Sequence, residues 1–187
     1  DLVFEHIAEG GNTRFTAIYL GHDAEQVGPV RSARLLDLEL PAMYRAVFAF
    51  SGASPGTRDK LVRVDFVTRA FSEIGAGQGP WFYRVDPDDL NVLMANTAAM
   101  EQLSLDRGNT GGRQSLTGLA FDPTPPNGGQ PATLINLRYS AETYNEWRWD
   151  PPTGLYMRWS DVKEGGVKQL IDALTLQNIS AANVAVV

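Results

Sequence analysis

The sequence contains no cysteine and only two histidines. Without a thiol there is no disulfide framework, no cysteine nucleophile and no thiolate ligand for a metal ion. The two histidines, His6 and His22, lack the spacing of metal ligands. A cysteine-free domain suits an oxidising or a reducing compartment equally well, so this absence leaves the compartment open.

Lysine is also scarce, and acidic residues outnumber basic ones. The lysines are Lys60, Lys163 and Lys168, and the formal net charge is −6. A nucleic-acid-binding face normally carries an excess of basic residues that neutralise phosphates, so the charge balance argues against that class of protein. No apolar run approaches the length of a membrane-spanning helix.

Complete catalytic and cofactor signatures are missing as well. The glycine-rich residues 108–112 (GNTGG) are not followed by the Gly-Lys-Ser/Thr of a phosphate-binding loop. Ser51 and Ser54 lack the nucleophile-elbow pattern of serine hydrolases. We therefore expect no cofactor and no metal centre, and two short polar motifs remain as clues to function.

The two halves of the chain differ in texture, and residues 105–131, rich in glycine and proline, mark the boundary. We expect an α+β fold, with an N-terminal mixed α/β sandwich-like domain over residues 1–115 and a smaller β-rich C-terminal domain over residues 116–187. The chain opens without methionine in one apolar stretch and stops in another. We therefore expect a longer polypeptide, with the C-terminal domain incomplete and any export signal outside this sequence.

In the first half, residues 2–20 surround a Gly-Gly-Asn turn and predict a β-hairpin. Ser32 is placed to cap a helix over residues 33–46, which Pro41 kinks or divides into two short pieces. Residues 87–105 predict the clearest helix, with an apolar stripe of Leu90, Leu93, Met94, Thr97 and Met100.

In the second half, residues 143–150 and 155–161 predict another hairpin around a Pro-Pro-Thr-Gly turn. Trp147 and Trp149 alternate and therefore share one strand face. An exposed tryptophan pair would suit stacking on sugars or docking a partner, but packing in a small β layer is the more common use of such residues.

The first polar motif is GPVRSAR, residues 28–34, where Arg31 and Arg34 flank Ser32. The exposed N–H groups of a helix start attract anions, and each arginine offers a planar fork that fits a carboxylate or phosphate. This arrangement predicts an anion pocket. The alternative, favoured by the motif alone, is that the arginines pair with acidic neighbours such as Asp37, Glu39 or Glu9.

The second polar motif is EHIAEGGNTRF, residues 5–15. Glu5 and Glu9 are expected on one strand face, and Arg14 follows the turn. Two carboxylates on one face could form an acid–base pair or hold a hard cation such as Ca²⁺ or Mg²⁺. The spacing alone favours a simpler arrangement, an exposed strand face with an arginine–glutamate pair across the hairpin.

The stretches EHIAEGGNTRFTAIY, GPVRSAR, AVFAFSGASP and IDALTLQNISAANVAVV resemble the YerB-like family of bacterial lipoproteins, whose domains have no known function. The resemblance spans nearly the whole chain and implies an export signal and a lipid-anchor cysteine before Asp1, which would place the protein outside the cytoplasm on the bacterial cell envelope. It implies neither an activity nor a cofactor. The positions that match the motifs are Glu5, Glu9, Gly10, Gly11, Thr13, Arg14, Phe15, Gly28, Pro29, Arg31, Ser32 and Arg34.

Three hypotheses about function follow. The leading one is an extracytoplasmic envelope module in which Arg14, Arg31 and Arg34 converge with Glu5 and Glu9. That pocket, with Ser32, would bind an anionic cell-wall fragment, a sugar phosphate or a protein partner. The second is a hydrolase or transferase acting on an envelope polymer, with Glu5 or Glu9 as general base. The third is purely structural: buried ion pairs satisfy the arginines and lock the hairpin in place.

Overall fold

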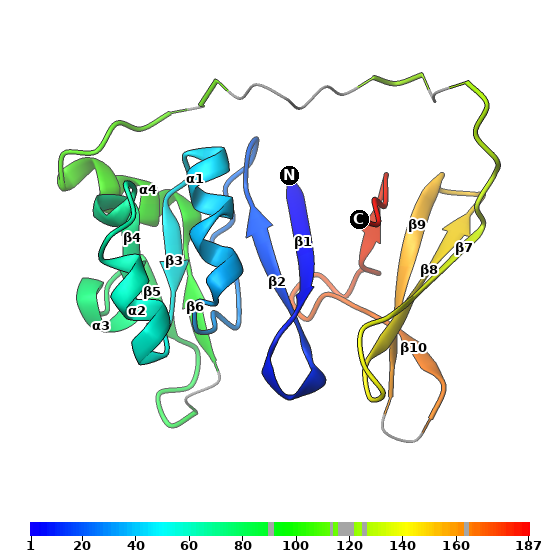
Figure 1. Ribbon diagram of the computed structural model, residues 1–187, viewed down its shortest axis with the longest axis horizontal. Helices are drawn as coiled ribbons and strands as arrows, with labels where there is room; N and C mark the ends of the chain where they lie inside the picture. Colours follow the sequence, from blue (N-terminus) through cyan, green and yellow to red (C-terminus); the bar gives the residue numbers. More distant parts are fainter. Residues whose placement is uncertain (90–91, 113, 116–121, 125–126, 163–164) are drawn as a thin grey trace. The chain divides into compact units, whose positions relative to one another are not determined.

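The computed structural model describes residues 1–89, 92–112, 114–115, 122–124, 127–162 and 165–187. The chain forms two compact units (Figure 1). Unit 1 consists of residues 1–4 and 16–119, and unit 2 consists of residues 5–15 and 120–187. The N-terminal hairpin is therefore divided between the units, because its tip belongs with the C-terminal part of the chain.

Unit 1 mixes short helices with short strands. Its elements, with the hairpin strands β1 and β2 included, are β1 (Leu2–Ile7), β2 (Thr13–Ile18), η2 (Leu35–Leu38), α1 (Leu40–Tyr44), β3 (Phe48–Phe50), α2 (Pro55–Leu61), η3 (Val67–Arg69), β4 (Ala70–Ser72), α3 (Glu73–Ala76), β5 (Phe82–Arg84), β6 (Leu93–Ala95) and α4 (Thr97–Asp106). Strand β3 runs parallel to β4, with α2 between them in the chain, and β5 pairs antiparallel with β6.

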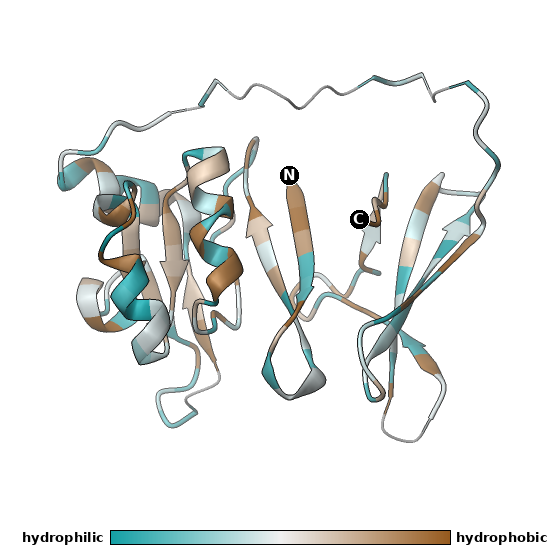
Figure 2. Ribbon diagram, in the orientation of Figure 1, coloured by the Kyte–Doolittle hydropathy of each residue, from teal (hydrophilic) through white to brown (hydrophobic). Residues whose placement is uncertain are grey.

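Phenylalanine dominates the interior of unit 1. One apolar cluster is built around Phe71 and Phe82 together with Leu93 and Met100 from β6 and α4. A second joins Phe48, Phe50, Leu61 and Phe66, and the last of these is fully buried. Figure 2 shows β3 in the brown of hydrophobic residues, as expected for a buried strand.

Unit 2 is an antiparallel sheet with the order β10-β9-β8-β7, in which β11 also pairs with β9 (Figure 1). The strands are β7 (Leu134–Arg138), β8 (Tyr144–Asp150), β9 (Leu155–Asp161), β10 (Val167–Gln169) and β11 (Ser180–Ala181). The tip of the hairpin adds the 3₁₀ turn η1 (Glu9–Gly11). The hairpin predicted from residues 143–150 and 155–161 is confirmed, since β8 pairs with β9 and Trp149 lies opposite Tyr156.

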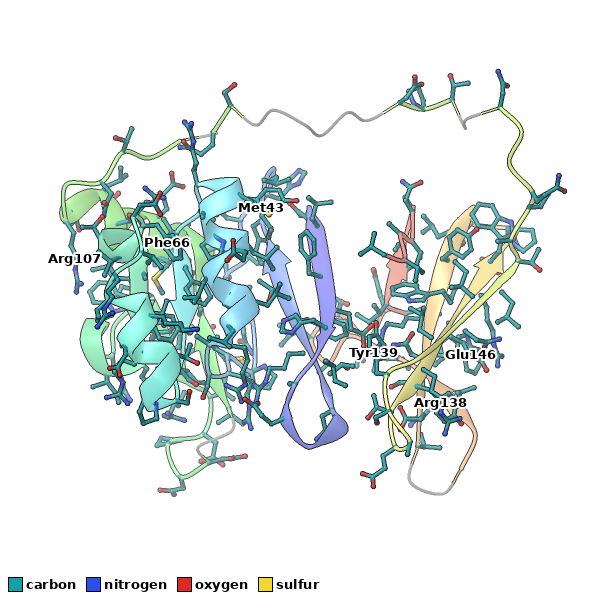
Figure 3. The ribbon with its side chains drawn as sticks, in the orientation of Figure 1. Met43, Phe66, Arg107, Arg138, Tyr139 and Glu146 are labelled. Atoms are coloured by element: carbon teal, nitrogen blue, oxygen red, sulfur yellow. The ribbon has the colours of Figure 1, made fainter. Side chains whose placement is uncertain are left out.

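The centre of unit 2 is polar. Among the residues that the structure describes there, only Asn145 and Arg158 are fully buried. Strand alternation places Asn145, Trp147 and Arg158 on one face of the sheet and Glu146 on the other. Figure 3 agrees, because Tyr139 and Glu146 lie on opposite sides of the sheet. With helices in unit 1 and an all-β unit 2, the α+β fold class is confirmed.

The helix prediction at Ser32 is wrong in its starting point. Residues 31–33 are extended because their backbone bonds to the chain after β3: Ala33 N–H donates to Gly52 O (2.8 Å) and Ser51 N–H to Arg31 O (3.1 Å). Helical structure starts only at η2, after Arg34. The division near Pro41 is confirmed, since η2 and α1 are two short pieces.

The helix predicted over residues 87–105 forms only in its second half. Leu93 and Met94 belong to strand β6, which pairs with β5, and the helix α4 begins at Thr97. The side chain of Asn96 accepts a hydrogen bond from Ala99 N–H (2.9 Å) and caps the helix there. Leu90, which completed the predicted stripe, lies outside the described residues.

Candidate functional site

A buried carboxylate marks the polar centre of unit 2. Glu5 Oε1 accepts hydrogen bonds from Arg158 Nη2 (2.7 Å) and Thr13 Oγ1 (2.8 Å), and Asn145 Nδ2 lies 3.0 Å from both Glu5 oxygens. We call these four residues and Tyr139 the Glu5 cluster. Its members come from the hairpin tip, from β8 and β9, and from the residue that follows β7.

Aromatic rings enclose the ion pair. The Glu5 and Arg158 side chains are 10% and 5% exposed, respectively. The Arg158 guanidinium lies 5.0 Å from the centre of the Phe15 ring and 6.0 Å from that of Trp147. Cation–π contact and the carboxylate together compensate the buried positive charge. The Glu5 carboxyl group is thus held by three donors, which is typical of a structural role.

The surroundings of Tyr139 raise the pKa of its phenol group. Burial raises the pKa of the Tyr139 phenol above its ordinary value of 10.0, and the neighbouring Glu5 carboxylate raises it further. Both effects disfavour a second negative charge beside Glu5. Tyr139 therefore keeps its proton to a higher pH than an ordinary tyrosine does.

The glycines of the EGGNTRF motif build the turn beside this cluster. Gly10 and Gly11 both have φ of +74°, a conformation that favours glycine. Gly11 O accepts a hydrogen bond from Ser140 Oγ (2.9 Å), and a Cβ at Gly11 would lie 3.1 Å from that oxygen. The turn also corrects the sequence prediction, because Glu9 lies in η1 and does not share a strand face with Glu5.

The GPVRSAR motif lies in unit 1, where the chain pairs first with strand β6 and then with the loop after β3. Val27 and Ala95 exchange both backbone hydrogen bonds (2.9 Å each), and Val30 N–H donates to Leu93 O (2.7 Å). Gly28 must be glycine at this contact, since a Cβ would lie 2.5 Å from Met94 Sδ and 2.8 Å from Leu93 O. The Gly28–Pro29 peptide is cis. Residues 31–33 then run beside the loop that follows β3.

Arg31 and Ser32 stand on this extended backbone. Arg31 is exposed, while its carbonyl accepts the Ser51 N–H (3.1 Å). The Ser32 and Ser51 hydroxyl oxygens are 3.5 Å apart. The backbone position of Arg31 is thus fixed by the loop after β3, and the residue is exposed at the surface.

Arg34 serves the fold through both its backbone and its side chain. Its N–H donates to Asp37 Oδ2 (2.6 Å), and Nη1 donates to the carbonyls of Ser32 (3.1 Å) and Ala33 (3.0 Å). Asp37 is only 6% exposed and also accepts from Thr16 Oγ1 (3.0 Å). The sequence prediction named Asp37 only as a neighbour for the arginines; its place three residues after Arg34 is a capping signal.

The predicted site residues fall in both units. Glu5, Glu9 and Arg14 belong to unit 2, whereas Arg31, Ser32 and Arg34 belong to unit 1. Their convergence on one pocket therefore stays a prediction. A pocket of about 350 Å³ in unit 2 is lined by none of them; its walls are Ser160, Asp161, Val162, Lys168, Gln169, Leu170 and Ile171.

The sequence analysis did not predict Asn145 and Arg158 as hydrogen-bond partners of Glu5. They lie 140 and 153 residues from Glu5 in the sequence, and no spacing pattern spans such a distance. In the described part of the chain, no three histidine, aspartate or glutamate side chains gather as metal ligands, and no helix has the length and apolar character to cross a membrane.

Comparison with known proteins identifies relatives of this fold. Residues 1–108 match the family described as "Protein of unknown function (DUF3048) N-terminal domain". Over 61 residues the chain is 44% identical to "Putative lipoprotein YerB" of Bacillus subtilis (strain 168), an alignment that covers 33% of this chain and 18% of that protein. The crystal structure of YerB from Bacillus subtilis matches with a TM-score of 0.75 and 24% identity. That match covers 95% of this chain and 58% of the YerB chain, so it shows a shared fold over little more than half of that structure.

Proposed function

Because the chain belongs to the DUF3048 family of proteins of unknown function, and is similar to a protein named as a lipoprotein, we propose that it is the extracytoplasmic part of a membrane-anchored envelope lipoprotein. The anchor would lie outside this sequence. We further propose that its role is binding, with an anionic cell-wall fragment or sugar phosphate as the ligand, and with a protein partner as the alternative.

One observation supports the proposed ligand site: the backbone of Arg31 is fixed by hydrogen bonds while the residue itself is exposed. Residues 27–30 bond to β6 and residues 31–33 bond to Ser51 and Gly52, so the backbone is fixed on both sides. Arg31 is an exposed residue on this backbone, and the Ser32 and Ser51 hydroxyl oxygens of the same two segments lie 3.5 Å apart. The planar guanidinium of an arginine suits a phosphate or carboxylate. Arg34, tied to backbone carbonyls, would position this segment, and Glu5, Glu9 and Arg14 would serve the hairpin.

The surroundings of the two glutamates support binding over catalysis. Glu5 accepts hydrogen bonds from Arg158, Asn145 and Thr13, which occupy its oxygens. A general base needs free access to the proton that it abstracts. Glu9 lies on an exposed turn. Neither arrangement favours a hydrolase or transferase that uses these groups.

Calorimetric titration and thermal unfolding with inorganic phosphate, a sugar phosphate and a peptidoglycan fragment test the proposal. A ligand at one hundred times its Kd stabilises the folded state by about 2.7 kcal/mol, which is readily measured. We expect Arg31→Ala to abolish the stabilisation by the active compound. The matched control is Arg63→Ala, which removes another exposed arginine of unit 1 and should leave it unchanged.

Two results would count against the anion site. One is stabilisation of the wild type and Arg31→Ala to the same extent by every compound, and the other is no stabilisation by any of them. In the second case, capture of an envelope protein by the wild type and not by Arg31→Ala would support the alternative ligand class.

A further inference from the structure

Strand β7 forms one edge of the sheet in unit 2. It pairs with β8 on one side, and among the described residues no strand pairs with its other side (Figure 1). An open edge presents a row of backbone N–H and C=O groups that can pair with another chain.

The hydrogen-bond pattern identifies which groups point outward. Trp149 N–H donates to Thr133 O (2.9 Å) and Tyr139 N–H to Thr143 O (3.0 Å), at the two ends of the β7–β8 ladder. In an antiparallel pair, residues alternate between bonding to the partner and facing away from it. The odd-numbered residues of β7 therefore bond to β8, and Leu134, Asn136 and Arg138 turn their N–H and C=O groups to the open edge.

Protection of this edge is slight. The side chains of Leu134, Asn136 and Arg138 are all exposed, and Leu134 is 50% exposed. The strand contains no proline and no lysine, which are common means of blocking edge pairing. Arg138 Nε and Nη2 donate to the carbonyls of Ser140 and Ala141 (3.1 Å each), which holds this guanidinium in the turn after the strand.

We propose that β7 pairs antiparallel with β7 of a second copy of this chain, about a two-fold axis at Asn136. In this register Asn136 faces its own copy and Leu134 faces Arg138. All three pairs are of the hydrogen-bonded kind, so the six outward groups of each strand are satisfied by the other strand. The strand has no acidic residue, so no carboxylates of β7 face each other. The aliphatic stem of Arg138 covers the exposed Leu134.

Cysteine cross-linking tests the register, since the natural chain contains no other thiol. Opposed residues of a hydrogen-bonded pair have Cα atoms about 5.5 Å apart, within the reach of a disulfide. We expect Asn136→Cys to form a disulfide-linked dimer on oxidation. A mixture of Leu134→Cys and Arg138→Cys should cross-link more than either variant alone. Glu142→Cys, at an exposed position outside the strand, is the control and should stay largely monomeric.

Sedimentation of the full chain tests the association itself. We expect the apparent mass to rise toward twice that of the monomer with concentration. Asn136→Pro removes one outward N–H from each copy and none of the bonds to β8, so it should raise the Kd of the dimer by about tenfold or more. Asn136→Lys is a second variant, with lysine as the usual edge-blocking residue, and circular dichroism checks that both fold.

The proposal is overturned by a monomeric mass at every concentration together with equal cross-linking of Asn136→Cys and Glu142→Cys. It is also overturned if a monomer binds an extended peptide through β7, because the edge would then serve a different partner.

Discussion

At the scale of single residues, the pair of Glu5 and Arg158 is the best-defined feature of unit 2. Both side chains are almost fully removed from water, and the Glu5 carboxylate also accepts hydrogen bonds from Asn145 and Thr13. Two charges buried in this way tolerate replacement of both better than loss of one, since a single loss leaves the other charge without compensation. The interior of unit 1 is filled by phenylalanine side chains, whereas the buried residues of unit 2 belong to the Glu5 cluster. We therefore expect the stability of the sheet to depend on this cluster.

Glu5→Gln should therefore destabilise unit 2 strongly. It leaves the Arg158 guanidinium buried without a counter-charge, and we expect a loss of about 3–5 kcal/mol in the free energy of unfolding. Urea titration followed by tryptophan fluorescence measures it, in a Trp81→Phe background so that Trp147, Trp149 and Trp159 of unit 2 report. Glu9→Gln, the same change on the exposed turn of the same hairpin, should cost less than about 1 kcal/mol. Equal effects of the two substitutions would refute a central role for Glu5.

Tyr139 gives unit 2 a pH dependence on the alkaline side. In the folded protein, burial raises the pKa of Tyr139 above the ordinary value of 10.0, and the Glu5 carboxylate raises it further. Between these two pKa values the unfolded chain has lost the proton that the folded chain retains. Stability is thus unaffected below pH 10 and decreases as the pH rises above it.

The test compares the wild type with Tyr139→Phe, because other tyrosines also titrate in this range. The difference in unfolding free energy between the two proteins should be constant below pH 10 and should then change in favour of the variant. Urea titrations at intervals from neutral pH upward measure this difference. A difference that stays constant throughout would mean that Tyr139 titrates normally.

At the scale of secondary-structure elements, local signals were reliable where the local pattern also decides the packing. The alternating residues of β8 and β9 around a Pro-Pro-Thr-Gly turn form the hairpin that they predict. Pro41 divides the helical region as its geometry requires. The α+β class, with its β-rich second part, follows from the same signals.

Elsewhere tertiary contacts decided the structure. Ser32 has the residue type of a helix cap, yet residues 31–33 pair with Ser51 and Gly52, and the backbone stays extended. Leu93 fits a helical stripe but lies in a strand against β5. Gly28 has no visible reason in the sequence; its reason is the closeness of Leu93 O, 65 residues away in the chain. Propensity is a weak guide wherever partners are this remote.

The candidate site shows the same division. The sequence singled out Glu5, Arg31 and Arg34 by residue type and by family motif. It could not supply Arg158 or Asn145 as partners of Glu5, because those contacts close loops of more than 100 residues. The role of Phe15 in the EGGNTRF motif, a ring against the Arg158 guanidinium, depends on the same closure.

At the scale of the whole molecule, unit 2 combines residues from both sides of the boundary expected between residues 115 and 116. Unit 2 consists of residues 120–187 and the hairpin tip, residues 5–15. The tip contributes Glu5 and Thr13 to the buried cluster, Phe15 to the Arg158 guanidinium, and Gly11 O to Ser140. A fragment that begins at residue 116 keeps every strand of the sheet but loses the counter-charge of Arg158.

We therefore expect residues 116–187 expressed alone to be largely unfolded, with poorly dispersed amide resonances and a non-cooperative thermal transition. Joining residues 1–19 to this fragment through a flexible Gly/Ser linker should restore a cooperative transition, because the hairpin returns the carboxylate and the Phe15 ring. The same fusion carrying Glu5→Gln should recover much less, since breaking the buried pair costs about 3–5 kcal/mol. A fragment that folds cooperatively without residues 5–15 would show that the sheet needs no counter-charge from the hairpin. The stability of unit 2 would then have to come from contacts within its own strands, such as the edge-on stacking of Trp149 and Tyr156.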